Sequence, residues 1–313
     1  MKQARPVGVL LMAYGTPARP EDVEAFYTDV RRGRPPSPEQ LADLQRRYTA
    51  VGGISQLAAR TAEQVAGVQA ALDHIAPGEF ACGFGAKHAE PSIEHTVAAM
   101  AADGIERLVA LVLAPHYSSG SVGEYLARAR SAADTHHMSL GAIADWHDHP
   151  VLIDLLAERV AAAFGTLGAE PADPSVELLV TAHSLPMRII ESGDGYDRRL
   201  LETAELIVAS SGTARWRVCW QSAGRTPEPW LGPDVLEVLR SLPSKGISGA
   251  IVCPAGFTSD HLEVSYDLDI EATAVAKGLG LRFARTASLN ADDRLCSALA
   301  GLIVHALPRE GSA

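Results

Sequence analysis

The chain of 313 residues has few cysteines and no long apolar run. None of its four cysteines lies close enough to another for a CxxC motif, which argues against a zinc-ligand pair: Cys82, Cys219, Cys253 and Cys296. No uninterrupted apolar stretch reaches the roughly 18 residues that a transmembrane helix needs. The apolar run at residues 7–13 follows basic residues but precedes no small-x-small cleavage site, so it predicts a buried strand rather than a signal peptide. We therefore expect reduced thiols and a cytoplasmic protein.

The sequence is also poor in positive charge. Lys and Arg total 27 against 38 Asp and Glu, which gives a formal net charge of −11. Nucleic acids and anionic membranes are themselves negatively charged, so this imbalance argues against both as partners. Apolar residues make up 47% and charged residues 21%, close to the globular average, so the chain can bury a full core.

Four common catalytic signatures are missing from the sequence. No GxGxxG follows a predicted strand, and neither GxxxxGK[ST], HExxH nor GxSxG occurs. These absences argue against a dinucleotide fingerprint, a P-loop, a zinc-protease helix and a hydrolase nucleophile elbow. The function therefore has to be argued from other residues.

Apolar strand-like runs alternate with amphipathic helical stretches along the whole chain. Helical periodicity is clear, for example, at residues 91–102, 152–163 and 234–242. Continuous apolar strands separated by helices indicate parallel sheets that are covered on both faces. The predicted strands are residues 7–13, 80–85, 108–114, 140–145, 178–182, 217–221, 250–254 and 281–284.

The two halves of the chain echo each other weakly. The segment around Tyr14 is similar to the one around His183, and Ala-Pro at 114–115 and Cys-Pro at 253–254 each end a strand. We predict an α/β fold of two similar open domains, residues 1–145 with an insertion at 17–60, and residues 146–313 with the last helix packing back on the first domain. Ligands of such folds bind outside the carboxyl ends of the strands, which makes a cleft between the halves the default site.

Two segments offer candidate chemistry at strand ends. His183, in Ala-His-Ser-Leu-Pro (182–186), can accept a proton or bind a metal near neutral pH, although a lone histidine can also serve in packing alone. Residues 256–263 open a predicted helix, with Asp260 as N-cap and Glu263 as its capping-box partner. Glu263, Asp267 and Glu271 then follow at helical spacing, as either a solvated acidic face or a path for a cation.

The predicted insertion is rich in arginine despite the acidic background. Arginines at 31, 32, 34, 46 and 47 lie near Gly-Gly-Ile-Ser (52–55), which favours a site for an anion, above all for carboxylates. The pair at 46–47 fits a solvated helix surface equally well. Trp-Gln-Ser (220–222) lies at another strand end, where packing is as good an interpretation as binding.

In chain order, these segments resemble the ferrochelatase family, whose members insert ferrous iron into a porphyrin. Each motif is weak alone, but their order over nearly the whole chain is specific. The resemblance is closest to the water-soluble branch of Gram-positive bacteria, which uses coproporphyrin III with its four propionates. It rests on Met-Ala-Tyr-Gly-Thr-Pro (12–17), Tyr-Thr-Asp-Val-Arg-Arg-Gly-Arg-Pro-Pro (27–36), Gly-Gly-Ile-Ser (52–55), Lys-His (87–88), Ala-Pro-His-Tyr-Ser (114–118), Ala-His-Ser-Leu-Pro (182–186), Trp-Gln-Ser (220–222), Pro-Trp-Leu-Gly-Pro (229–233) and Gly-Phe-Thr-Ser-Asp-His-Leu-Glu (256–263).

The resemblance implies a class II chelatase fold, in which two Rossmann-like halves flank a porphyrin cleft. It implies His183 and Glu263, from separate halves and on opposing walls, as the catalytic pair where the metal is inserted. Tyr14 would face the macrocycle and become an axial iron ligand in the product, and Asp267 and Glu271 would continue an acidic path for metal or protons. Five further residues match positions that hold the porphyrin and its propionates: Arg31, Arg46, Arg47, Ser55 and Tyr125.

The implied reaction is a lyase reaction of haem biosynthesis. Fe²⁺ enters coproporphyrin III to give coproheme, two pyrrole protons leave and no ATP is used. A bent macrocycle would expose its nitrogen lone pairs, neutral His183 would accept a pyrrole proton, and Glu263 would relay the proton or hand over the metal. Iron is then a substrate rather than a bound cofactor. Because only Cys296 lies near the C-terminus, we expect no [2Fe–2S] cluster.

Three alternatives share parts of this pattern. They are a ferrochelatase for protoporphyrin IX, a class II chelatase for sirohydrochlorin with a histidine pair at the metal point, and a non-catalytic tetrapyrrole carrier. The His183–Glu263 combination with the Tyr14 segment favours ferrochelatase. As partners we expect the porphyrin, ferrous iron and a transient contact with a downstream haem-pathway enzyme, but no nucleic acid and no integral membrane association, for a monomer. The His-rich residues 136–137 and 145–149 are predicted to serve surface packing.

Overall fold

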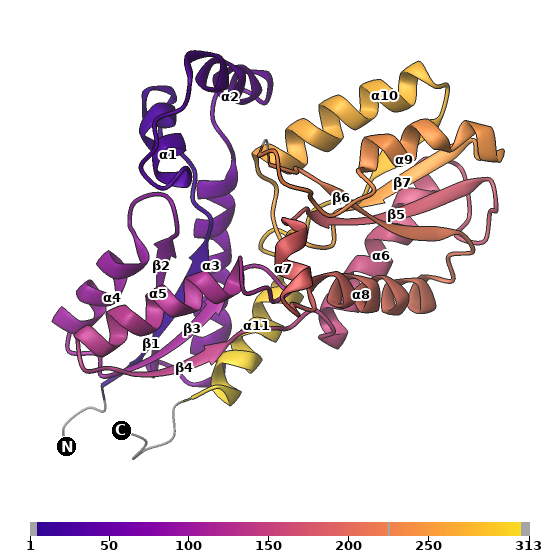
Figure 1. Ribbon diagram of the computed structural model, residues 1–313. Helices are drawn as coiled ribbons and strands as arrows, with labels where there is room; N and C mark the ends of the chain where they lie inside the picture. Colours follow the sequence, from indigo (N-terminus) through magenta and orange to yellow (C-terminus); the bar gives the residue numbers. More distant parts are fainter. Residues whose placement is uncertain (1–4, 225, 308–313) are drawn as a thin grey trace. The chain divides into compact units, whose positions relative to one another are not determined.

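The structure is a computed structural model that describes residues 5–224 and 226–307 (Figure 1). Its contacts divide the chain into two units, each with one parallel four-stranded sheet. Unit 1 comprises the chain up to Ala114, the segment Ser121–Ala144 and the chain from Asn290 on, and unit 2 comprises Pro115–Gly120 and Asp145–Leu289. The predicted α/β class with two similar parallel sheets is confirmed.

The strands follow the apolar runs of the sequence. All of β1 is buried, and in β5 only the last residue, His183, is partly exposed. Runs without polar alternation are typical of strands that are covered on both faces. The eight strands of the described ranges, each overlapping one predicted run, are β1 (Val7–Ala13), β2 (Phe80–Ala86), β3 (Arg107–Val112), β4 (Ser139–Ile143), β5 (Val176–His183), β6 (Trp216–Gln221), β7 (Gly249–Cys253) and β8 (Arg282–Arg285).

Both sheets have the same strand order when each is counted from its own first strand. The order is β2-β1-β3-β4 in unit 1 and β6-β5-β7-β8 in unit 2. The shared order agrees with the repeat in the sequence. In each sheet the order reverses beside the first strand, at β1–β3 and at β5–β7, and ligands of open α/β sheets bind outside such switch points.

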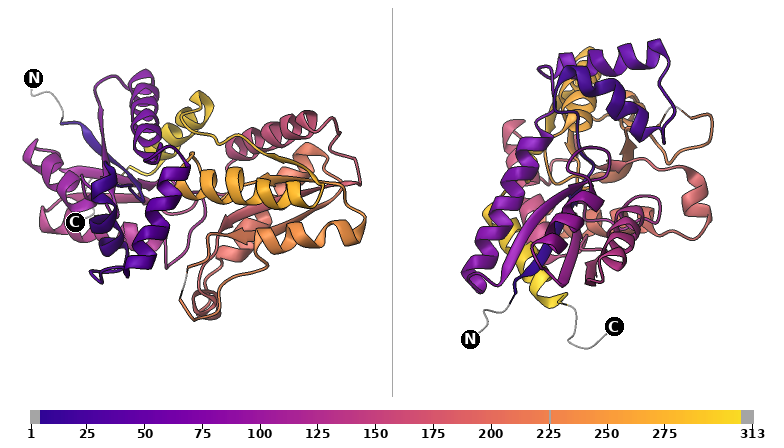
Figure 2. Two further views of the ribbon diagram at one scale, coloured as in Figure 1. Left: turned by 90° about the horizontal axis from the view of Figure 1, so that it is seen from above. Right: turned by 90° about the vertical axis from the view of Figure 1, so that its left-hand side faces the viewer.

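Helices cover both faces of the unit 1 sheet. The predicted insertion at residues 17–60 holds η1, α1 and α2. The last helix, α11, packs beside α3 (Figures 1 and 2), so closely that a Cβ at Gly67 would come within 2.6 Å of the Cys296 sulfur. The elements are η1 (Pro20–Asp22), α1 (Val23–Val30), α2 (Pro38–Ala50), α3 (Leu57–Ile75), α4 (Ile93–Ala102), α5 (Val122–Thr135) and α11 (Asp293–His305).

In unit 2, α6 and α8 pack together on one face of the sheet, and α9, η3 and α10 lie on the other (Figure 1). Pro115–Gly120 belongs to this unit, outside the predicted range of 146–313, because Asp194 accepts hydrogen bonds from Ser118 and Ser119. The elements are α6 (Pro150–Thr166), α7 (Met187–Glu191), α8 (Tyr196–Ser211), α9 (Val235–Ser241), η2 (Pro243–Lys245), η3 (Val264–Ala272) and α10 (Thr273–Gly278).

The segment after Glu263 is not the α-helix that the sequence predicted. Val264–Ala272 forms a π-helix, η3, in which the hydrogen bonds span five residues instead of four. The predicted capping box is wrong, because the Asp260 carboxylate accepts a hydrogen bond from Ser288 at 2.7 Å and no side chain among the described residues caps η3. Val264 and Leu268 on this helix are fully buried in the core of unit 2.

Within residues 5–224 and 226–307, no helix combines the length and the apolar character needed to cross a bilayer.

Candidate functional site

His183 is held at the carboxyl end of β5 by its backbone and by one ring nitrogen. Its Nδ1 lies 2.5 Å from the carbonyl oxygen of Ser184, and its own carbonyl accepts a hydrogen bond from the Tyr196 hydroxyl at 3.1 Å. With Nδ1–H donating to a carbonyl, Nε2 is the nitrogen that faces the site. The side chain is about one third exposed, at 34%. His183 is therefore oriented but accessible.

The loop that follows β7 carries the second candidate group to the same place. The backbone nitrogen of Gly256 donates to the carbonyl of Thr181 in β5 at 3.0 Å, so the loop crosses the end of the neighbouring strand. Glu263 lies at the end of this loop, just before η3, and its Oε1 is 3.6 Å from His183 Nε2. The two groups thus flank the switch point of the unit 2 sheet.

This arrangement corrects one expectation and adds one residue. His183 and Glu263 do not come from separate halves, because both belong to unit 2 and to neighbouring strand ends. The sequence argument also missed His261, whose Nε2 lies 3.6 Å from the other carboxylate oxygen of Glu263. Its signal was its place in the run 256–263, two residues before Glu263. The carboxylate therefore lies between two imidazoles.

The close charges shift the pKa values of both groups. Burial alone would lower the pKa of His183, but the carboxylate of Glu263, the Ser184 carbonyl and the carboxylate of Asp267 raise it to about 9. Burial alone would raise the pKa of Glu263, but His183 and His261 hold it far below its usual range. At neutral pH the pair is an imidazolium facing a carboxylate. A proton must therefore leave His183 before its imidazole can act as a neutral base.

Asp267 and Glu271 of η3 do not form a solvated surface. Asp267 is buried, at 7% exposure, and accepts a hydrogen bond from the Ser222 hydroxyl. Glu271 is half-buried. Val264 and Leu268 of the same helix are buried in the core of unit 2. Carboxylates held at a protein–water boundary attract cations and protons, so the row can serve the site.

Tyr14 stands at the end of β1 in unit 1, where the residue is 42% exposed. The ring packs edge-on against His88, with 4.7 Å between centroids, and His88 Nδ1 lies 2.7 Å from Asp29. Burial lowers the pKa of His88 in spite of Asp29, so this imidazole is neutral at pH 7. An exposed phenol on a rigid strand end can face a flat ligand.

The arginines of the insertion differ in their contacts within the protein and in how far their side chains are exposed. Arg31 ends α1 and donates to the carbonyl of Arg34 at 3.2 Å. Arg46 and Arg47 on α2 both pair with Asp43, and the Arg46 side chain is 66% exposed while that of Arg47 is 26% exposed. Arg46 therefore has its guanidinium largely in solvent, whereas Arg47 is partly packed.

Two other expected porphyrin-binding residues are buried. The hydroxyl oxygen of Ser55 accepts a hydrogen bond from the Leu57 backbone nitrogen at 3.1 Å, at the start of α3. Tyr125 in α5 is 5% exposed, with the Lys87 ammonium 5.0 Å from its ring centroid. Ser55 therefore shapes the turn before α3, and Tyr125 supports the Lys87 side chain.

The His-rich segment 145–149 forms an ion-pair network in unit 2. His147 contacts Asp145 at 2.6 Å through Nδ1 and Glu202 at 3.0 Å through Nε2. His147 is buried at 8% exposure rather than superficial. No group of three or more metal-ligating side chains in the described ranges is arranged to hold a metal ion. The segment therefore forms a partly buried ion-pair network, whereas surface packing was predicted.

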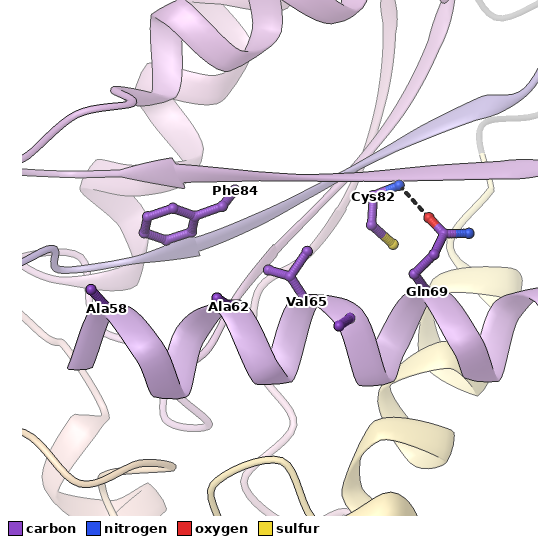
Figure 3. A pocket seen from close by; sticks show the side chains of 7 residues that line it. Ala58, Ala62, Val65, Gln69, Cys82 and Phe84 are labelled. Carbon is purple, nitrogen blue, oxygen red and sulfur yellow. Dashed lines mark hydrogen bonds between the residues drawn. The ribbon is translucent and has the colours of Figure 1, made fainter. Parts of the chain in front are cut away.

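A pocket of about 380 Å³ lies elsewhere, between α3 and β2 in unit 1 (Figure 3). Its lining is apolar except for Gln69, which hydrogen-bonds to the backbone nitrogen of Cys82 at 2.8 Å. Burial raises the pKa of the Cys82 thiol to about 12, so the pocket offers no reactive thiolate. It contains none of the predicted site residues.

Comparison with known proteins shows which family this chain is similar to. The family model described as Ferrochelatase matches residues 6–307. The chain is 44% identical over 308 residues to the coproporphyrin III ferrochelatase of Anoxybacillus flavithermus, covering 97% of this chain and 98% of that one. It is 42% identical over 304 residues to that of Oceanobacillus iheyensis, covering 96% and 97%.

Solved structures share the fold at much lower identity. The sirohydrochlorin chelatase SirB from Bacillus subtilis subspecies spizizenii, in complex with cobalt, has a TM-score of 0.56 at 11% identity, covering 96% of this chain and 95% of that one. CbiX, described as the terminal enzyme of sirohaem biosynthesis in denitrifying bacteria, has a TM-score of 0.54 at 17% identity, covering 96% and 100%. These likenesses show the chelatase fold alone. From the family match and its relatives, this chain belongs to the ferrochelatase family.

Proposed function

We propose that this chain inserts Fe²⁺ into coproporphyrin III and releases two pyrrole protons, with no nucleotide involved. The observation that carries the proposal is the His183–Glu263 pair, with 3.6 Å between Nε2 and Oε1, at the switch point of its sheet. The choice of porphyrin is supported by relatives with 42–44% identity over nearly their full length, whose names specify coproporphyrin III.

The charge state of the pair suggests how a metal and a proton exchange there. At rest the pair holds one proton, on His183. When Fe²⁺ approaches the Glu263 carboxylate, its positive charge offsets the negative charge that stabilised the imidazolium. The pKa of His183 therefore falls. The imidazole then releases its proton to solvent and becomes a base for a pyrrole N–H. The substrate cation thus prepares the base that its own insertion requires.

The carboxylates of Glu263, Asp267 and Glu271 form an acidic row. To this row we assign the second proton and the route of the metal. Asp267 and Glu271 follow Glu263 along η3, and Asp267 is held by Ser222. We assign to this row the passage of protons or Fe²⁺ to and from Glu263. A row of carboxylates lowers the cost of moving a divalent cation through a partly buried region.

Binding of the porphyrin is assigned to unit 1. The exposed ring of Tyr14 is proposed to face the macrocycle and to ligate iron in the product. Arg31, Arg46 and Arg47 are proposed to pair with propionates, because guanidinium groups bind carboxylates through two hydrogen bonds. Ser55 and Tyr125, which are both largely buried, are proposed to help hold the porphyrin from the same unit.

Anaerobic spectrophotometry tests the proposal. Purified protein, coproporphyrin III in excess and Fe²⁺ should give several turnovers per protein. A carrier would stop at one equivalent, which would refute the enzymatic function. Parallel assays with protoporphyrin IX and with sirohydrochlorin test the substrate. A higher kcat/KM for either of them than for coproporphyrin III would overturn that part of the proposal.

We further propose a monomer in the cytoplasm that meets a downstream haem-pathway enzyme transiently. All four cysteines are free thiols, which supports a reducing compartment. Light scattering on the purified protein tests the monomer, since a mass of 33.1 kDa is then expected. Twice that mass at micromolar concentration would contradict it.

A further inference from the structure

Arg285, the last residue of β8, binds two parts of the chain that lie on either side of Glu263. Its Nε donates to Asp269 Oδ1 at 2.7 Å and its Nη2 to Asp269 Oδ2 at 3.1 Å, a bidentate pair. The same Nη2 lies 3.4 Å from Asp260 Oδ1. The Arg285 side chain is only 17% exposed. Asp260 lies in the loop before Glu263, and Asp269 lies within η3 after it.

Arg285 with Asp260 and Asp269 forms a clamp around Glu263, and a second set of contacts fixes the guanidinium of this clamp. Arg285 Nη1 donates to the Thr286 carbonyl at 3.0 Å and to the Ser288 hydroxyl at 3.3 Å. The Ser288 hydroxyl in turn donates to Asp260 Oδ1 at 2.7 Å. The guanidinium is therefore fixed in one orientation, and both aspartates are fixed by it.

The π-helix explains why such a clamp is needed. Most π-helical geometry occurs as single-turn bulges, whereas η3 is nine residues long. If one residue of η3 returned to α-helical bonding, the side chains beyond it would rotate by about 100° around the axis, the angle per residue of an α-helix. Asp267 and Glu271 would then no longer keep their present places relative to Glu263.

We propose that Arg285 is a positioning residue of the iron-insertion site, which holds the loop and η3 in the register that places Glu263 against His183. Within residues 5–224 and 226–307, Arg285 makes no hydrogen bond or ion pair with His183 or Glu263. It acts through Asp260 and Asp269. This inference rests on the proposed function of Glu263 and assigns a support to the same site.

The test compares Arg285→Met with a matched control on the same strand. Arg282→Met removes an arginine at the other end of β8, where Arg282 contacts Asp173, Ser175 and Ser248. In steady-state assays with coproporphyrin III and Fe²⁺, Arg285→Met should lower kcat about 10- to 100-fold, the scale expected when a reacting group is displaced by about 1 Å. The KM for the porphyrin should stay within about twofold of wild type, because unit 1 residues bind it.

Two more variants keep the outcome interpretable. Arg285→Lys keeps the charge but loses the bidentate fork, so it should recover only part of kcat. Asp269→Asn removes one arm of the clamp at a side chain that is 44% exposed, so the core is untouched, and it should lower kcat in the same direction. Circular dichroism and Tm identify any variant that is unfolded.

The turnover of wild type and of the variants distinguishes a failure of this inference from a failure of the proposed function. If wild type and Arg282→Met do not turn over, the proposed function fails. If they turn over, and folded Arg285→Met and Asp269→Asn keep the kcat of wild type, the positioning role of Arg285 is overturned. A fall in Tm alone, equal to that of Arg282→Met and without a change in kcat, would likewise overturn it.

Discussion

Gly256 lies so close to Ala182 that a Cβ on Gly256 would come within 2.4 Å of the Ala182 Cβ. This contact presses the loop after β7 onto the end of β5, one residue before His183. The loop ends at Glu263, so the missing side chain at Gly256 sets how near the two charged groups can approach. Sequence spacing alone gives no sign of this contact.

Replacing Gly256 with alanine should therefore affect both stability and catalysis. The new methyl group must displace backbone, so we expect a loss of about 1–3 kcal/mol in unfolding free energy and a lower kcat. Gly165→Ala is the control, because Gly165 lies in α6 with no atom near its Cβ position, and alanine there should be neutral or stabilising. Denaturant unfolding and iron-insertion assays give both readouts. Equal behaviour of the two variants would contradict the steric argument.

Replacing His183 with alanine should abolish iron insertion and leave porphyrin binding in place. Loss of a positioned base costs about 10²–10⁴ in rate, whereas the porphyrin-binding residues are assigned to unit 1. Anaerobic turnover and porphyrin fluorescence titration measure the two properties separately. His95→Ala, on the exposed surface of α4, is the control. Retained turnover in His183→Ala would remove His183 from the mechanism.

Replacing Glu263 with glutamine should lower the pKa of His183. The carboxylate is the main group that raises this pKa against burial, and an amide of the same shape removes its charge. NMR titration of the ring should show His183 charged at pH 7 in wild type and neutral at pH 7 in the variant. An unchanged titration would mean that the ion pair does not control the charge of the base.

Replacing Arg31 with leucine should raise the KM for the porphyrin with little change in kcat. A charge-assisted hydrogen bond contributes about 1.5–3 kcal/mol, so a rise of about tenfold or more is expected if Arg31 binds a propionate. Arg19→Leu is the control in the same insertion, since Arg19 pairs with Asp22 on the surface. Steady-state kinetics at varied concentrations of coproporphyrin III measures this KM. An unchanged KM would exclude Arg31 from the propionate site.

The His147 network should make stability depend on pH. Burial opposes the charged form, but Asp145 and Glu202 raise the pKa of His147 above its ordinary 6.5, so its contribution is complete below pH 6.5 and is lost as pH rises through the folded pKa. The pKa of Asp145 is lowered from 3.8 by His147 and Arg199, against burial, so its contribution is lost only as pH falls below that value.

The stabilisation by His147 should therefore be greatest between these two limits. We expect His147→Gln to lose about 1–2 kcal/mol there, the scale of a buried hydrogen bond. Urea unfolding from pH 4 to pH 9 measures the difference from wild type. A difference that grows toward pH 9 would have the wrong sign for this network.

Much of the fold could be predicted from the sequence because the strands are covered on both faces. Such strands must be apolar along their whole length, as in β1 and β5, and the helices between them must have one apolar face. The same reasoning placed His183 at a strand end. The motif at 256–263 drew attention to Glu263, but the sequence placed it on the wall opposite His183 and missed His261 in the same run.

The parts that could not be predicted depend on contacts between distant residues. The spacing of Glu263, Asp267 and Glu271 fits an α-helix as well as the observed π-helix, and the choice rests on partners such as Ser222 and Arg285 from other elements. Likewise, no local signal shows that Gly256 must pass over Ala182. Local propensity and period, which are properties of neighbouring residues, determined the elements and the candidate chemistry. The tertiary structure decided the helix type, the charge on His183 and its distance to Glu263, because these depend on packing and on electric fields from residues far away in the chain.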